Sequence, residues 1–194
     1  HSIYVRMVEG RPTTVPTPAP TSNPSLVPTV TNVPTISIEP TSAPTMTDFP
    51  YSCRTLSSEG VTESGTYTIW PDGPLGLSHT VYCDMETDGG GWMLMFAYNH
   101  VGGEKNGVVV GTIPTDPATS YSHVNVEDMY STTSEISEVR FYCQTTQHDR
   151  IVHFKTSNSM QLDIALDGSA AGNTASFWTS GFTELDNHTA TLPG

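Results

Sequence analysis

The most constraining feature of this sequence is a run of three glycines, Gly89, Gly90 and Gly91, followed directly by Trp92. Glycine loses more backbone entropy on folding than any other residue, so three in a row are costly to order. We therefore expect them only where the backbone needs positive φ angles, or where another segment comes too close for a Cβ atom. The adjacent tryptophan indicates that this turn packs against such a crossing segment.

The glycine run connects two stretches that predict β-strands. Residues 78–85 alternate between apolar and polar side chains before the turn, and residues 92–98 form an apolar run after it. Residues 66–70 are β-branched and aromatic, which predicts a preceding strand. Residues 54–60, directly after Cys53, predict one or two helical turns that end at Gly60. The region around the glycines is therefore expected to fold as short strands with a small helix.

The second half of the sequence predicts further short elements. Residues 137–143 and 150–155 each alternate, and the six residues between them suggest an antiparallel hairpin. A short helix is expected at residues 124–130, with Asn125 as a candidate N-cap. Two more strands are expected at residues 161–166 and 176–179.

Residues 12–45 contain nine prolines and nine threonines but one charged residue, Glu39. Proline fixes φ and removes a backbone donor, so neither a helix nor a central strand is expected here. We predict an extended segment of about 3.1 Å per residue. It is either an O-glycosylated stalk or an unmodified disordered linker. We assign residues 1–48 to this stalk and residues 49–194 to a folded domain.

The overall charge excludes several classes of partner. The net charge is −13 and the chain has only seven basic residues, so nucleic acids and anionic membranes are poor partners. No run of about 18 apolar residues occurs, so no transmembrane segment is predicted. The sequence starts at His1 and stops at Gly194 without a closing element. We interpret it as a processed product or a fragment.

The order of motifs around the glycine run resembles the N-terminal part of fibrinogen-related domains. The resemblance covers residues 51–96 and implies an α+β fold of short antiparallel strands with one or two short helices. It also implies a disulfide between Cys53 and Cys83, and residence outside the cell. It makes the three glycines and Trp92 a structural signature of the fold. The motifs that carry it are Ser52-Cys53, Ser64-Gly-Thr-Tyr-Thr-Ile69 and Val81-Tyr-Cys-Asp-Met-Glu-Thr-Asp-Gly-Gly-Gly-Trp92.

Beyond Tyr98 the sequence departs from that family pattern. The family continues with an arginine-rich strand and a Gly-Glu-Phe-Trp-Leu-Gly segment, whereas residues 99–122 form a loop rich in Gly, Pro, Asp and Ser. This is more similar to variant fibrinogen-like proteins, intelectin-like lectins among them. We therefore divide the folded part into a glycine–tryptophan subdomain, residues 51–98, and a divergent, incomplete body, residues 99–194.

Three acidic residues before the glycines mimic the start of a calcium loop. Asp84, Glu86 and Asp88 have the required spacing, but an EF-hand needs a bidentate Glu at position twelve, which here is Met95. We favour a solvated turn, in which Asp88 precedes Gly89 for turn chemistry. The resemblance implies calcium only for a full-length domain. No cofactor, metal ligand or catalytic residue is assigned.

The chain has three cysteines, and an odd number implies a free thiol, an intermolecular bond or a partner outside this sequence. Cys143 ends a strand face that looks buried. It is either a simple buried thiol or has its disulfide partner beyond residue 194, and we favour the second. Residues 187–189, Asn-His-Thr, form an N-glycosylation sequon at Asn187.

The sequence contains no motif of a zinc hydrolase, a serine hydrolase or a P-loop enzyme. We therefore predict an extracellular, non-enzymatic recognition protein that binds glycans or other extracellular ligands. The alternative is a structural or adhesion protein in which the same module mediates assembly without binding sugar. An extracellular enzyme with an unrecognised site is a third reading, and no motif favours it.

Overall fold

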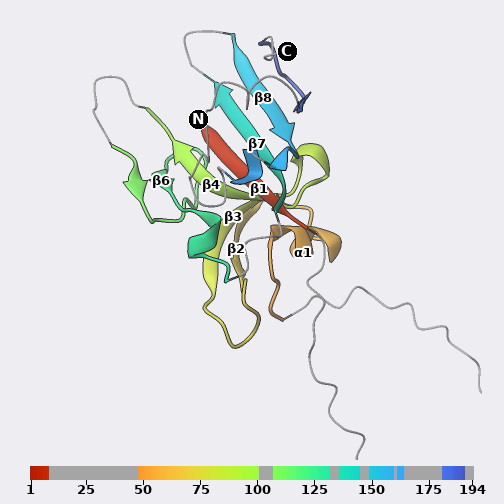
Figure 1. Cartoon of the computed structure of the whole chain (residues 1–194), viewed down its shortest axis with the longest axis vertical. Coiled ribbons are helices and arrows are strands. Elements are labelled where there is room, and N and C mark those ends of the chain that lie inside the picture. The colour runs from red at the N-terminus through yellow and green to blue at the C-terminus, as the bar shows by residue number, and fades with distance from the viewer. Residues whose placement is uncertain are drawn as a thin grey trace, which may run out of the picture.

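The computed structural model describes residues 1–8, 48–100, 107–131, 136–144, 149–159, 161–163 and 181–190. This part of the chain is organised around a mainly antiparallel sheet with the order β2-β3-β4-β1-β7-β8-β9, and β6 pairs with both β4 and β5 (Figure 1). The strands are β1 (Ser2–Met7), β2 (Gly65–Ile69), β3 (His79–Asp84), β4 (Trp92–Tyr98), β5 (Val109–Val110), β6 (Tyr121–His123), β7 (Ile136–Gln144), β8 (Ile151–Thr156) and β9 (Phe182–Glu184). The short helices are α1 (Cys53–Ser58), η1 (Thr87–Gly89) and η2 (Val126–Asp128).

The N-terminal strand β1 lies in the middle of this sheet, with β4 on one side and β7 on the other (Figure 1). The assignment of residues 1–48 to a disordered stalk is therefore wrong for its first residues. Ser2–Met7 is a buried central strand because its apolar side chains enter the core and its backbone is paired on both edges. Residues 9–47, which include the whole Pro/Thr-rich segment of residues 12–45, lie outside the described residues, so the stalk itself stays a prediction.

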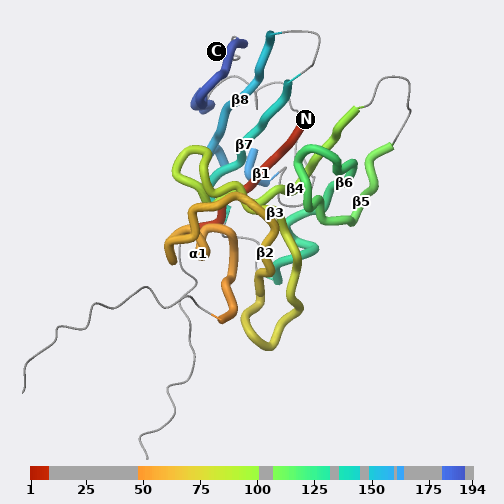
Figure 2. Tube along the Cα trace, turned by 180° about the vertical axis from the view of Figure 1, so that it is seen from behind, coloured from red at the N-terminus to blue at the C-terminus, as the bar shows by residue number. Residues whose placement is uncertain are grey.

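The two faces of the sheet differ in character. On the first face Val5 of β1 packs in the main core with Met93 and Val139, and α1 adds Leu56 to it. On the second face Tyr4 joins a small apolar cluster whose other buried members are Trp92, Leu94 and Ala97. Figures 1 and 2 show the β2–β3 and β7–β8 hairpins extending from opposite ends of the molecule. The second face, between those ends, carries the charged side chains described below.

The elements predicted around the glycines are confirmed. Helix α1 begins after Ser52, whose side-chain oxygen accepts a hydrogen bond from the Thr55 backbone at 3.2 Å. A disulfide joins Cys53 of α1 to Cys83 of β3, with the Cα atoms 5.5 Å apart. On the loop-entropy model a cross-link of this span stabilises the fold by about 3.5 kcal/mol. The disulfide thus fixes the helix onto the strand that leads into the glycine turn.

The second half agrees with the sequence only in part. The hairpin is confirmed, since β7 and β8 pair antiparallel from Val139 and Thr156 to Gln144 and Ile151. The helix expected at residues 124–130 is a single 3-10 turn, and Asn125 precedes it without a side-chain cap. Its amide oxygen instead lies 2.9 Å from Nε2 of His123.

The strand expected at residues 161–166 is wrong over residues 161–163, which are helical. The carbonyl of Asn158 accepts hydrogen bonds from the backbones of Gln161 and Leu162, which starts a helical turn. Gln161 is also buried, and its side chain is hydrogen-bonded to the Thr156 hydroxyl. This contact holds the helical turn against the end of β8. The strand expected at residues 176–179 lies outside the described residues.

Cys143 is only partly buried and carries a free thiol, with Sγ 3.8 Å from Nε2 of His1. The expectation of a buried strand face holds at Val139 but is wrong at Cys143, because β7 reaches the end of the sheet there. An intermolecular or downstream disulfide through Cys143 stays a prediction.

Candidate functional site

The glycine turn meets both conditions that its sequence implied. Gly89, Gly90 and Gly91 have φ angles of +79°, +73° and +76°, a backbone conformation that residues with a side chain rarely adopt. A Cβ atom on Gly90 would lie 2.4 Å from the carbonyl oxygen of Met85, and one on Gly91 would lie 3.0 Å from Cα of Arg54. The turn is therefore folded tightly on itself and crossed by α1.

Trp92 anchors this turn to the second face of the sheet. Its side chain is fully buried, and its Nε1 donates a hydrogen bond to the carbonyl of Thr87 at 2.9 Å. The guanidinium carbon of Arg6 lies 4.1 Å from the centre of the Trp92 ring. The turn is thus held against β1, and the acidic side chains beside it are brought to the polar groups of that face.

Asp88 belongs to a compact network of alternating charges. Its carboxylate lies 2.6 Å from Nη2 of Arg6 and 2.6 Å from Nζ of Lys155. Glu138 completes the network at 2.6 Å from Arg6 and 2.9 Å from Lys155. These residues come from β1, β7, β8 and the turn, so the network joins segments far apart in the sequence.

Asp84 is held separately, by Arg140. Nη2 of Arg140 donates to the Asp84 carboxylate at 2.7 Å, and the Thr87 hydroxyl donates to it at 2.7 Å. Burial opposes ionisation of Asp84, but the charge of Arg140 and the hydrogen bonds from Thr87 outweigh it and lower its pKa. Asp84 is consequently a fixed carboxylate at neutral pH.

These contacts show that the residues present do not fit a calcium ion. Asp84 and Asp88 each face different cations, and Glu86 is exposed. Among the residues that the structure describes, no group of three or more His, Cys, Asp or Glu side chains converges on one point. The carboxylates that suggested a calcium loop serve instead as partners of Arg140, Arg6 and Lys155.

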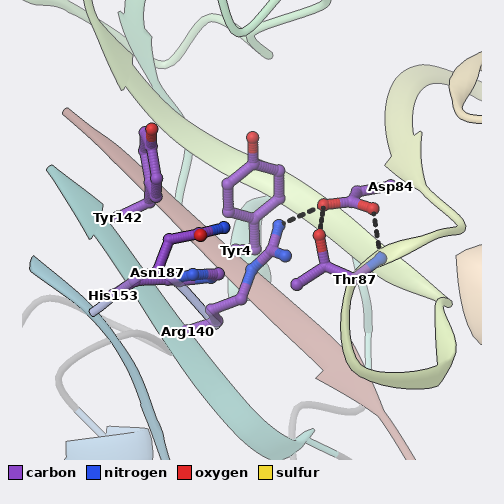
Figure 3. Close-up of a pocket in the computed structure, with 7 residues that line it drawn as sticks. All are labelled: Tyr4, Asp84, Thr87, Arg140, Tyr142, His153 and Asn187. Carbon is purple, nitrogen blue, oxygen red and sulfur yellow. Dashed lines mark hydrogen bonds and ion pairs between the residues drawn. The ribbon is translucent and has the colours of Figure 1, made fainter. Parts of the chain in front are cut away.

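A pocket of about 280 Å³ lies beside the Arg140–Asp84 pair (Figure 3). It is lined by side chains of β1, β3, β7 and β8, by the glycine turn and by the loop after β9. Figure 3 shows the Arg140 guanidinium beside the Tyr4 ring, with one nitrogen directed to Asp84. The lining residues are Tyr4, Asp84, Thr87, Arg140, Tyr142, His153 and Asn187.

Arg140 is the most constrained of these side chains. It is 2% exposed, and its guanidinium carbon lies 3.9 Å from the centre of the Tyr4 ring and 5.1 Å from that of Trp92. Two aromatic rings and the Asp84 carboxylate together fix its orientation. The Arg140 guanidinium thus forms a planar floor of the pocket, and its orientation is fixed before any ligand binds.

His153 and Tyr4 have defined protonation states in this setting. Nδ1 of His153 lies 2.8 Å from the Asp186 carbonyl, which can only accept, so Nδ1 carries the hydrogen. Burial lowers the pKa of His153, which favours a neutral ring. Burial also raises the pKa of Tyr4 to about 12, so its hydroxyl stays protonated.

The loop that supplies Asn187 is tied to the edge of β8. The backbone of Leu185 donates to the carbonyl of His153 at 3.0 Å, and that of Thr189 donates to the carbonyl of Ile151 at 2.9 Å. The backbone of His153 donates to Nδ1 of His188 at 2.8 Å. Asn187 therefore has a fixed position over the pocket, with a φ angle of +66°.

The site combines predicted and unpredicted residues. The cysteines, the glycines and Trp92 lie together around the turn, and Asn187 lies at the pocket. Tyr4, Arg140, Tyr142 and His153 were not predicted, because they meet only through the pairing of β1 with β7 and of β7 with β8. Their one sequence signal was their place on the polar face of alternating strands.

Lowering the pH is expected to weaken the fold through Asp84 and Asp88. Burial opposes ionisation of Asp88, but hydrogen bonds from Lys155 and Arg6 and their charges lower its pKa below the ordinary 3.8. A carboxyl whose folded-state pKa is depressed stabilises the fold above its unfolded-state pKa, and this is lost as pH falls through the folded-state value. Urea unfolding from about pH 5 downwards should show this loss, and Asp88→Asn should flatten it. Glu86→Gln is the control, and equal pH slopes for the Asp88→Asn variant and the unmodified chain would contradict the expectation.

Comparison with known proteins identifies part of the chain. Residues 49–107 match the model of the family described as fibrinogen beta and gamma chains, C-terminal globular domain. The chain is 49% identical over 45 residues to tenascin-R of Rattus norvegicus, 42% identical over 53 residues to techylectin-5A of Tachypleus tridentatus, and 47% identical over 45 residues to ficolin-3 of Homo sapiens. These matches cover 23%, 27% and 23% of this chain.

The same matches cover 3%, 18% and 14% of those relatives, so the chain spans less than a fifth of their length. No solved structure matches the chain. In the part that the structure describes, no helix has both the length and the apolar character needed to cross a membrane. The resemblance to fibrinogen-related domains is confirmed for the segment that contains α1 and β2 to β4.

Proposed function

We propose that this chain, whose residues 49–107 are a fibrinogen-like segment, is an extracellular and non-enzymatic recognition protein that binds glycans. The disulfide between Cys53 and Cys83 supports an extracellular location, because such bonds persist in oxidising compartments. Techylectin-5A, one of the similar proteins, carries the word lectin in its name. These two points support a recognition protein as the class of function. The pocket supports a sugar as the type of ligand.

The observation that carries the proposal is the Arg140–Asp84 pair held between aromatic side chains in the pocket. Tyr142 offers a ring that can pack against the C–H groups of a sugar, while the fixed polar groups can bond its hydroxyls. Binding sites commonly combine such walls with a few well-placed polar groups. The volume of about 280 Å³ is just below the range of about 300–1,000 Å³ for drug-sized ligands, which suits one sugar ring.

The charges favour a neutral ligand. Arg140 is neutralised by Asp84, and the chain as a whole has a net charge of −13, which repels anions. Because Asp84 is held ionised, it lacks the proton that a general acid would need at neutral pH. Both points support a neutral sugar as the ligand and binding, not hydrolysis, as the outcome.

A glycan array probed with the full chain made without N-glycans, so that Asn187 is unmodified, tests this proposal. We expect binding to neutral sugars, and Tyr142→Ala should weaken it at least about tenfold because one wall of the pocket is lost. Tyr121→Ala is the matched control, since Tyr121 is a partly exposed tyrosine on β6 outside the pocket. Absence of sugar binding, or equal loss in both variants, would contradict glycan recognition through this pocket.

One observation favours the alternative of an adhesion module that assembles without sugar. Leu75 and Leu77, in the loop between β2 and β3, are 100% and 80% exposed. Exposed leucines of this kind can mark a protein contact. If Leu75→Ser with Leu77→Ser abolished self-association of a chain that bound no sugar, the alternative would replace the glycan proposal.

A further inference from the structure

Asn187 combines two properties that the sequence alone did not connect. It is the acceptor residue of the sequon at residues 187–189, and it lines the pocket beside Arg140 and Tyr142. Asn187 as a residue is exposed at the surface of the molecule. In Figure 3 its side-chain amide is directed toward the side chains of Tyr4 and Arg140.

The surrounding loop gives Asn187 little freedom to turn away. The Thr189 hydroxyl accepts a hydrogen bond from the backbone of Ile151 at 2.7 Å, and the His188 ring accepts one from the backbone of His153 at 2.8 Å. These contacts flank Asn187 on its C-terminal side, and Leu185 is bonded to β8 on the other. A group attached to Asn187 therefore starts at a fixed point over the pocket.

We propose that Asn187 is a modification site that closes this pocket, so that an N-linked sugar and an external ligand exclude each other. In the modification, Nδ2 of Asn187 loses one hydrogen and bonds to the anomeric carbon of a sugar carried by a lipid diphosphate. The lipid diphosphate is the leaving group, and the hydrogen departs as a proton. The first sugar ring then lies over Tyr142 and Arg140, in a space suited to one ring.

The covering of the pocket does not depend on what the pocket binds, whereas the exclusion of an external sugar rests on the proposed function. Two measurements keep these apart. The first is nitration of Tyr142 by tetranitromethane, mapped by mass spectrometry, with Tyr121 as an internal reference because it is also partly exposed and lies on β6. The second is binding of a neutral sugar.

The comparison uses the full chain made in a secretory host that attaches N-glycans and in a bacterial periplasm that does not. We expect a sugar on Asn187 in the first form and at least about fivefold slower nitration of Tyr142, with Tyr121 unchanged, because the attached ring shields the pocket. Asn187→Gln from the secretory host should nitrate like the unmodified chain. Thr189→Ser should stay glycosylated and shielded, because it keeps the hydroxyl.

The outcomes separate the two proposals. Equal nitration of Tyr142 in both forms, or no sugar on Asn187 from the secretory host, would overturn the closure. Sugar binding by the periplasmic form alone would support both proposals. A nitration difference in a chain that binds no sugar in either form would support the closure and count against glycan recognition.

Discussion

Replacing Val5 with proline is expected to destabilise the folded chain by about 3 kcal/mol or more. Val5 has no exposed surface and lies opposite Met93 of β4 and Val139 of β7. In a strand paired on both sides every backbone N–H points to a neighbour, so proline removes a buried donor and leaves an acceptor unpaired. Urea unfolding of the full chain should show a much lower midpoint, since total stabilities are about 5–15 kcal/mol.

Val8→Pro is the matched control for this substitution. Val8 is 47% exposed and follows the last residue of β1, so proline there should change the unfolding midpoint little. Equal midpoints for Val5→Pro and Val8→Pro would mean that residues 2–7 do not stand in the sheet. The same result would also remove the support for the pocket, because β1 supplies Tyr4 to it.

The sequence did not predict β1 because the signals for a central strand are not local. Its six residues alternate, but its partners in β4 and β7 lie about 90 and 135 positions further along the chain. A Pro/Thr-rich segment begins at residue 12, soon after β1 ends, and its composition led to the assignment of the whole N-terminus to a stalk. Long-range pairing of this kind is decided by the fit of the completed sheet and not by propensity.

The region around the glycines was predicted well because its signals are local. Helix α1, strands β2 to β4 and their turn each depend on a cap, an alternation or a glycine within a few residues. The second half was predicted less well. Residues 161–163 were assigned to a strand, although the Asn158 carbonyl and the buried Gln161 favour a helical turn.

In the candidate site, too, the residues with local signals were predicted and those that depend on long-range strand pairing were not. Trp92 and Asn187 could be marked from motifs, but the pocket forms only where β1, β7 and β8 place their polar faces together. The interpretation of the acidic residues as a solvated turn was incomplete for the same reason. Their cationic partners, Arg6, Arg140 and Lys155, stand on strands whose neighbours the sequence did not specify.

Replacing Gly90 with alanine is expected to destabilise the fold by about 3 kcal/mol or more. The added Cβ would lie 2.4 Å from the Met85 carbonyl oxygen, so the turn would have to open. Opening it would move Thr87, whose carbonyl accepts from Trp92 and whose hydroxyl donates to Asp84. Urea unfolding should therefore show a loss of stability, and the Arg140–Asp84 pair should lose its geometry with it.

Gly89→Ala separates this clash from the general strain of a positive φ. Gly89 has nearly the same φ angle as Gly90, +79° against +73°, but the nearest atom to its added Cβ is Nη1 of Arg6 at 4.0 Å. Alanine there should cost only about 1 kcal/mol. The difference of about 2 kcal/mol between the two variants measures the close approach of Met85 to Gly90. Equal losses would mean that backbone conformation alone explains the glycine run, and that the turn is looser than its contacts indicate.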